Sequence, residues 1–283
     1  MNITPSAVKE LREKTNAGMM DCKKALEHAK GNMEQAIEVL RKKGLAVAQQ
    51  KASRQASEGI LGNYYDESGK LGCLVEVNCE TDFVVKTDDF QNFVSKLTGV
   101  IRQKPFENLE ALLGTSFNGK DTVKESVTGL IAKIGENMQV KRFTRWETKT
   151  DAEKIGFYLH AGSKIGVLVL LTDPSGALTT DTAKEIAMHV AAMSPRYLKR
   201  EEVPAEVVAK EKEIQSATLD FKKPPEIQEK ILAGKLNKFY GETCLEEQVF
   251  VKDPEGKKSV KEWLKLKAPT AKIEKFVRLQ VGA

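Results

Sequence analysis

Residues 74–85 read Leu-Val-Glu-Val-Asn-Cys-Glu-Thr-Asp-Phe-Val-Val, which is the pattern of a strand followed at once by the start of a helix. The β-favouring residues before Cys79 predict the strand. Thr81 and Asp82 are typical of a helix start, yet the large apolar Phe83 comes directly after them. Two interpretations are open: Phe83 packs into the local core while Asp82 caps the helix, or the tip of this turn enters another protein.

Outward from this stretch, the chain repeats one pattern of strands and a helix. In the first copy, strands over 59–64 and 74–77 flank a turn at 66–69, and a helix follows over 89–100. The same order returns about 95 residues later, and each copy ends in a third strand. The sequence therefore predicts an α+β fold with two duplicated subdomains, each a sheet covered by helices. The remaining strands and the second helix are expected at 138–143, 156–160, 167–170, 182–193 (the helix) and 273–279.

The start of the chain predicts a separate unit of three short helices. Thr4 and Pro5 are typical of a helix start, and residues 16–18 break that helix. Asp21 is placed to cap the second helix, and Gly44 to end the third. In the second and third helices, apolar residues recur at spacings of three and four, which places them on one face. The arrangement resembles a ubiquitin-associated domain.

Composition shifts along the chain predict its domain boundaries. We expect the three-helix unit over residues 1–44, a polar helical linker over 45–58, one subdomain over 59–147 and the second over 148–283. An insertion over 202–240 interrupts the second subdomain. Its two charged helices carry narrow apolar stripes on either side of a proline-rich break, which predicts a coiled-coil hairpin projecting from the body. Such a hairpin is a candidate for self-association into a homodimer.

Composition and charge describe an ordinary water-soluble protein. Of 283 residues, 41% are hydrophobic and 30% are charged, and the net charge is only +5. Basic and acidic residues are interleaved, so no basic stripe indicates direct binding of nucleic acid. No apolar run approaches the roughly 20 residues needed to cross a bilayer. Glu10 and Glu13 lie where a signal peptide would avoid acids, so we expect a cytoplasmic protein without membrane contact.

The residues that usually carry chemistry or hold metals are dispersed. The four cysteines show no paired ligand spacing, so we expect them to be reduced and packed as small apolar side chains. The three histidines are far apart, and no nucleophile or zinc-binding motif lies near them. The sequence therefore predicts no catalytic site, no metal and no cofactor. These residues are Cys22, Cys73, Cys79, Cys244, His28, His160 and His189.

One segment imitates a phosphate-binding loop. Gly114 to Asp121 matches the pattern G-x-x-x-x-G-K, but Asp121 replaces the Ser or Thr that would hold magnesium. Residues 109–113 before it favour a helix, where the motif requires a strand. We interpret the segment as a surface turn.

Several segments closely resemble the elongation factor Ts family of the bacterial translation machinery. Residues 11–26 and 76–84 carry the most specific motifs, and residues 132–137 and 160–162 also match. The resemblance covers nearly the whole chain in the family's order and spacing. Asn16 stands where the family usually has Gly, and Asn tolerates the left-handed backbone region better than most residues.

The resemblance implies a guanine-nucleotide exchange factor for elongation factor Tu, and not an enzyme. Such a factor binds the GDP-bound partner, displaces Mg²⁺ and speeds GDP release so that GTP can bind during translation elongation. By the same resemblance, Phe83 enters an apolar pocket and Asp82 disturbs the surroundings of the Mg²⁺. The contacts implied near the Mg²⁺ are Thr81, Asp82, Phe83 and Val84. Those implied elsewhere are Leu11, Met19, Met20, Ile134, Gly135 and His160.

Alternatives remain for single residues and for the whole chain. Met19 and Met20 either fill the small core or form an adaptable binding surface, and His160 is either a satisfied surface histidine or a contact. An RNA-binding translation accessory protein is one rival function, although aromatic residues make up only 6% and tend to fall on core faces. An enzyme acting through Cys79 beside Asp82 is another.

Overall fold

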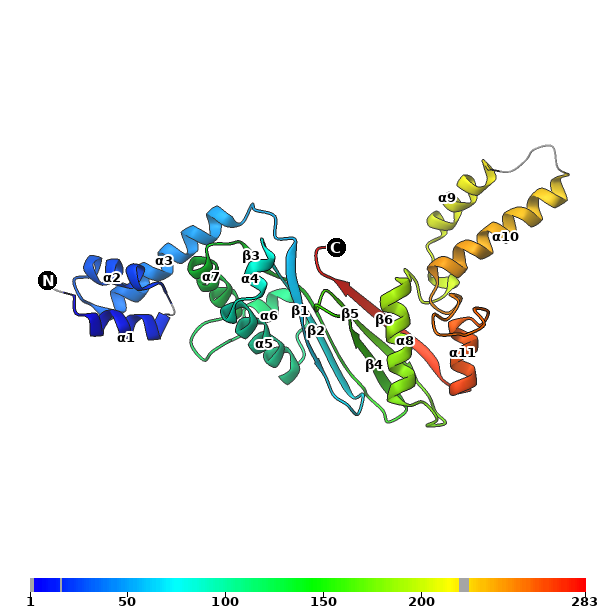
Figure 1. Cartoon of the computed structure of the whole chain (residues 1–283), viewed down its shortest axis with the longest axis horizontal. Coiled ribbons are helices and arrows are strands. Elements are labelled where there is room, and N and C mark those ends of the chain that lie inside the picture. The colour runs from blue at the N-terminus through cyan, green and yellow to red at the C-terminus, as the bar shows by residue number, and fades with distance from the viewer. Residues whose placement is uncertain (1–2, 16, 219–223) are drawn as a thin grey trace.

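The computed structural model describes residues 3–15, 17–218 and 224–283 and has an elongated shape (Figure 1). Three helices form a unit at the N-terminal end, two sheets with their helices form the middle, and a pair of helices projects at the far end. The described part of the chain is α+β, as the sequence predicts.

The N-terminal unit consists of α1 (Pro5–Thr15), α2 (Met19–His28) and α3 (Met33–Lys51). Asn32 caps α3, because its side chain accepts a hydrogen bond from the Gln35 backbone N–H (3.1 Å). The apolar faces of the three helices meet in one small core. Its buried members are Val8, Leu11, Cys22, Ala25, Leu26, Ala29 and Ala36.

The predicted cap of α2 is wrong. Because α2 begins at Met19, Asp21 lies inside its first turn, where the carboxylate pairs with Lys43 of α3 (2.5 Å). Gly18 occupies the cap position without a side-chain hydrogen bond. Asn16, which the sequence places in the break between α1 and α2, lies outside the described residues.

Helix α3 does not end at Gly44, as predicted, but continues to Lys51. Its second half packs along α7 (Val123–Ile134), and Val47 and Ala48 pack against the core beneath. A glycine inside a helix costs about 1 kcal/mol relative to alanine, and the packing of α3 on α7 offsets this cost. The predicted polar linker is therefore, up to Lys51, a docked continuation of α3.

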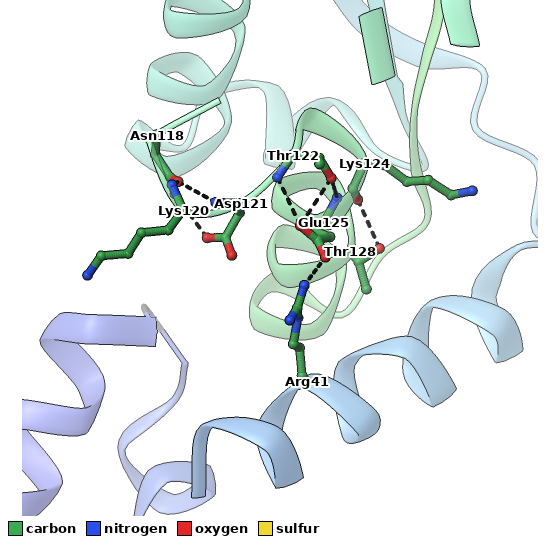
Figure 2. Close-up of polar contacts among 8 residues, drawn as sticks. All are labelled: Arg41, Asn118, Lys120, Asp121, Thr122, Lys124, Glu125 and Thr128. Atoms are coloured by element: carbon green, nitrogen blue, oxygen red, sulfur yellow. Dashed lines mark hydrogen bonds and ion pairs between the residues drawn. The ribbon is translucent and has the colours of Figure 1, made fainter. Parts of the chain in front are cut away.

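A polar contact joins the same two helices. Figure 2 shows Arg41 of α3 reaching Glu125 at the start of α7, with which it forms an ion pair. The same carboxylate accepts hydrogen bonds from the backbone N–H (2.9 Å) and the hydroxyl (3.2 Å) of Thr122, which caps α7. This exposed ion pair adds a polar contact between α3 and the body at the cap of α7.

The first sheet has three antiparallel strands in the order β1 (Glu58–Tyr65), β2 (Leu71–Cys79) and β3 (Met138–Glu147). Helix α5 (Asp88–Gln103) covers one face, and α6 (Leu109–Leu113) and α7 complete that layer. The buried side chains of α5 recur at helical spacing, so they form one face against the sheet. Its buried apolar residues are Phe90, Phe93, Val94, Leu97 and Ile101.

The second sheet repeats the first, with the antiparallel order β4 (Glu153–Leu159), β5 (Ile165–Thr172) and β6 (Lys272–Gln280). Helices α8 (Thr180–Met193) and α11 (Val260–Lys267) cover its outer face. The predicted order of two strands, a helix and a third strand is confirmed in both copies.

Each copy places a glycine of its first strand under the covering helix. A Cβ atom on Gly62 of β1 would collide with Thr98 of α5, and one on Gly156 of β4 would collide with the backbone of Ala183 in α8. The missing side chain lets helix and sheet approach closely at these two points.

The two sheets pack face to face, which the sequence pattern does not predict. Leu61 and Leu74 of the first sheet meet Ile155 and Leu168 of the second in a core between the sheets. The middle of the molecule therefore has four layers, in the order helix, sheet, sheet, helix (Figure 1). Because β2 is covered on both faces, nearly all of its residues are buried.

The insertion forms α9 (Ala205–Ser216) and α10 (Pro225–Thr243), which contact each other and project from the second sheet (Figure 1). Helix α10 ends at Thr243 and not at residue 240, and the connection predicted around residue 223 lies partly outside the described residues. At the base, Arg200 pairs with Glu247 (2.5 Å) and lies 4.6 Å from the ring centre of Tyr240. No described residue of the two helices is buried.

Candidate protein-interaction site

The turn after β2 exposes a phenylalanine. A short helix, α4 (Asp82–Val85), follows the strand, and Phe83 on it is 75% exposed. The interpretation that Phe83 packs into the local core is therefore wrong. The ammonium of Lys86 lies 5.6 Å from the centre of its ring. An exposed aromatic ring beside charged groups is suited to anchoring a protein interface.

Asp82 lies beside this ring and does not cap α4, since the cap position belongs to Thr81. The carboxylate of Asp82 is exposed and lies 2.9 Å from Lys86 Nζ. This hydrogen bond and the positive charge of Lys86 lower the pKa of Asp82 below its usual value, so the carboxylate stays ionised at neutral pH. The role implied for Val84 beside the tip has to be corrected. Val84 is 5% exposed and packs into the first subdomain's core, so it anchors α4 and does not frame the tip.

Thr81 is held from several directions. Its backbone N–H donates to Glu136 Oε2 (3.0 Å) and its hydroxyl to Glu136 Oε1 (2.8 Å). Its carbonyl accepts a hydrogen bond from Cys79 Sγ (3.1 Å). Glu80 in turn accepts from the Asn137 backbone N–H (2.6 Å). These bonds fix the tip of β2 to the turn that follows α7.

Two of the predicted contacts lie at the end of α7, where that turn begins. Gly135 ends α7 in the left-handed conformation (φ 84°), and Ile134 is half-buried against the core. The structure thus holds Thr81 against Glu136, the residue that follows the predicted contacts 134 and 135. No local pattern indicates the roles of Glu80 and Glu136, because their hydrogen-bond partners lie 57 and 55 residues away in the chain.

His160 lies at the same end of the sheets. It is exposed in the turn after β4, with Nδ1 3.1 Å from the Tyr158 hydroxyl oxygen. Lys164 of the same turn pairs with Glu58 (2.5 Å), and Glu58 stands opposite Cys79 in the β1–β2 pairing. The His160 turn therefore lies near the end of β2 that carries the exposed phenylalanine.

The N-terminal unit carries a second exposed apolar surface. Met19 and Met20 are each 60% exposed at the start of α2, so the interpretation that they fill the small core is wrong. The partner contact implied for Leu11 also has to be corrected. Leu11 is fully buried in that core, so it supports the unit without forming its surface.

The segment that imitates a phosphate-binding loop is a surface turn, as predicted. The side-chain oxygen of Asn118 accepts hydrogen bonds from the backbone N–H groups of Lys120 (3.0 Å) and Asp121 (2.7 Å). Figure 2 shows the Lys120 side chain pointing away from this turn. The segment follows helix α6 rather than a strand, and the Asp121 carboxylate would repel a phosphate.

The thiol beside the tip, Cys79, is buried and hydrogen-bonded. Burial raises the pKa of Cys79 to about 12, and the thiol donates its hydrogen bond to a backbone carbonyl. Over residues 3–15, 17–218 and 224–283, no cluster of three His, Cys, Asp or Glu residues is placed to hold a metal ion. Among the same residues, no helix is long and apolar enough to cross a membrane.

Comparison with known proteins gives one family. Residues 80–283 match the family described as elongation factor TS. The chain is 44% identical to elongation factor Ts of Trichlorobacter lovleyi over an alignment of 294 residues. This alignment covers 100% of the chain and 93% of the relative. The corresponding protein of Nautilia profundicola is 47% identical over 289 residues, with 99% and 93% covered. That of Syntrophotalea carbinolica is 46% identical over 288 residues, with 100% and 94% covered. On these matches, the chain belongs to the elongation factor Ts family.

Proposed function

We propose that this chain is a guanine-nucleotide exchange factor for elongation factor Tu. It binds the GDP-bound form, displaces Mg²⁺ and promotes GDP release, so that GTP can bind during translation elongation. The observation that carries the proposal is Phe83, 75% exposed on a tip that hydrogen bonds hold in place and next to the ionised Asp82. Membership of the elongation factor Ts family supports it.

Exchange requires differential binding and no chemical step. A factor that binds nucleotide-free elongation factor Tu more tightly than the GDP-bound form weakens GDP binding by the same ratio. Coupling free energies of this kind are typically about 1–3 kcal/mol. In the proposed mechanism, Phe83 enters an apolar pocket of the partner while the charge of Asp82 disturbs the Mg²⁺ site. Loss of the ion removes a large positive charge beside the diphosphate, so GDP leaves faster.

The other exposed residues supply further contacts in this proposal. Met19 and Met20 present flexible apolar side chains that adapt to a partner surface. Gly135 and His160 lie at the end of the sheets that carries the tip, so one partner can touch both together with Phe83. Contacts on the N-terminal unit and on the body would hold the partner while the tip acts.

Replacing Phe83 tests the proposal. Because the ring is exposed, Phe83→Ala should leave the melting temperature nearly unchanged, while truncation of an interface anchor commonly costs at least about 2 kcal/mol of binding. We expect stimulated release of labelled GDP from elongation factor Tu to fall by roughly thirty-fold at subsaturating factor. The matched control is Leu266→Ala, since Leu266 is 67% exposed on α11.

The two variants separate the possible results. A loss of GDP release with Phe83→Ala but not with Leu266→Ala supports the proposal. If Phe83→Ala melts early and keeps its activity per folded molecule, the ring belongs to the core and the proposal is wrong. If the unaltered chain does not speed GDP release at all, the exchange function itself is wrong.

A further inference from the structure

We infer that Glu136 is a positioning residue for exchange: its carboxylate holds the Phe83 tip in the conformation that engages the partner. The inference rests on the proposed function, because it concerns how the same tip is presented. Glu136 lies in the turn after α7, while the tip follows β2. The two segments are 55 residues apart in the chain, and folding brings them into contact.

The carboxylate of Glu136 plays the part that the glutamate of a capping box plays elsewhere, because it accepts the backbone N–H of the cap residue. Thr81 stands at the cap position of α4, yet its side chain makes no capping hydrogen bond. Its hydroxyl instead donates to Glu136 Oε1 (2.8 Å), and its backbone N–H donates to Oε2 (3.0 Å). Both oxygens of one carboxylate are thus used to hold a single residue, and hydrogen bonds to a charged acceptor are stronger than neutral ones.

A reciprocal contact strengthens the junction. Glu80, next to Thr81, accepts a hydrogen bond from the backbone N–H of Asn137, next to Glu136 (2.6 Å). Each segment therefore offers a carboxylate to a backbone N–H of the other. The Asn137 side chain donates to the Arg54 carbonyl (2.7 Å), and Arg54 lies 3.5 Å from Glu80. Three hydrogen bonds to two carboxylates therefore hold the tip against the turn after α7.

The tip needs such external support. Helix α4 has four residues, and a helix this short is unstable by itself because nucleation is unfavourable. Within α4, the buried Val84 and the partly buried Val85 pack against the core. A ring that must be ordered on binding loses part of its binding free energy, whereas a ring already held in place does not. Holding Thr81 two residues before Phe83 keeps the ring ready to bind.

The test compares Glu136→Ala, Glu136→Gln and a matched control in the full-length chain. Glu262 is the control, because its Oε2 accepts the backbone N–H (2.8 Å) and the hydroxyl (3.0 Å) of another cap residue, Ser259, in a local capping box at the start of α11, far from the tip. We expect Glu136→Ala to lower the maximal rate of GDP release from elongation factor Tu about ten-fold. The half-saturating concentration should change less, because the contacts on the N-terminal unit remain.

Glu136→Gln should retain part of the rate, since an amide oxygen still accepts one of the two bonds. Hydrogen exchange of the Thr81 backbone N–H should be faster in both Glu136 variants than in the unaltered chain. Glu262→Ala should change neither the maximal rate nor the Thr81 exchange. Equal loss of rate in Glu262→Ala and Glu136→Ala would mean a general effect on folding and would overturn the inference.

A double variant with Phe83→Ala decides whether Glu136 acts through the ring. Once the ring is absent, adding Glu136→Ala should lower the rate by less than two-fold more. If the fold-losses in rate of the two single variants multiply in the double variant, the inference is overturned and the exchange function stands. An unaltered rate in Glu136→Ala, with Phe83→Ala deficient, would do the same. Failure of the unaltered chain to release GDP would reject the proposed function instead.

Discussion

Cys79 and Phe83 lie four residues apart and have opposite surroundings. The thiol is fully buried in the first subdomain's core, and the ring is 75% exposed. Between them, the buried strand β2 ends and the exposed helix α4 begins. Hydrogen bonds to Glu136 hold Thr81 at this junction. At the residue scale, the site is therefore a rigid support carrying one exposed apolar side chain.

The buried thiol leads to a prediction about reactivity. Because burial raises the pKa of Cys79 to about 12, almost no thiolate forms at pH 8. We expect iodoacetamide to leave Cys79 unmodified in the native protein and to modify it rapidly after unfolding in guanidinium chloride. Peptide mass mapping reads out each cysteine separately. Rapid, selective labelling of native Cys79 would instead revive the interpretation of an enzyme that acts through this thiol.

At the scale of helices and strands, the sequence predicted what local patterns decide. Turn residues and alternating apolar residues located both strand pairs, and helical spacing located α5 and α8. The end of α3 was missed, because Gly44 favours a helix end only while the packing of α3 on α7 is unknown. The sequence does not decide the exposure of Phe83 for the same reason: a phenylalanine after a helix start fits a core as well as a surface. Packing between distant segments decides such cases, and no local pattern records it.

The projecting hairpin gives a prediction at the same scale. Replacing residues 208–235 by a short Gly-Ser link keeps the base contacts around Arg200 and Tyr240, so the body should melt at nearly the same temperature. We propose that the apolar residues of the hairpin allow self-association, which the replacement should reduce in sedimentation experiments. GDP release should be largely retained.

Two substitutions serve as a gentler version of this experiment. Ile214 and Ile227, on α9 and α10, are 50% and 46% exposed. The pair Ile214→Ser and Ile227→Ser should reduce self-association as the replacement does, without removing a helix. Complete loss of GDP release by a folded hairpin-less protein would show that the hairpin contacts elongation factor Tu directly.

At the scale of the whole molecule, a buried carboxylate joins the two subdomains. Glu76 of β2 is fully buried, and its carboxylate lies 2.7 Å from Arg142 Nε of β3. It also accepts a hydrogen bond from the backbone N–H of Gly282 (3.2 Å), just after β6 of the second sheet. Arg142 in turn donates to the Gln280 carbonyl (3.0 Å). The last strand of one subdomain is thus tied to the middle strand of the other.

Removing this carboxylate should destabilise the fold strongly. Breaking a buried ion pair by deleting one partner typically costs about 3–5 kcal/mol, because a charge is left unpaired. Since Arg142 is partly exposed, we expect Glu76→Ala to cost roughly 3 kcal/mol of unfolding free energy in urea. Asp151→Ala is the control: its carboxylate lies 3.2 Å from Lys70 Nζ, and the side chains of Asp151 and Lys70 are 96% and 62% exposed. Such surface pairs contribute about 0–1 kcal/mol. Equal costs for the two variants would contradict the role given to Glu76.

Helix α3 runs without a break from the N-terminal unit onto the body, so the rotation of the unit about the helix axis is fixed relative to the body. One alanine inserted between Leu40 and Arg41 would turn Met19 and Met20 by about 100° around the α3 axis relative to Phe83. Four inserted alanines would bring Met19 and Met20 back to within about 40° of their original direction and displace the unit by about 6 Å along the axis. Affinity for elongation factor Tu should therefore vary periodically with the number of inserted residues, with a deep loss at one or two and a partial return at four.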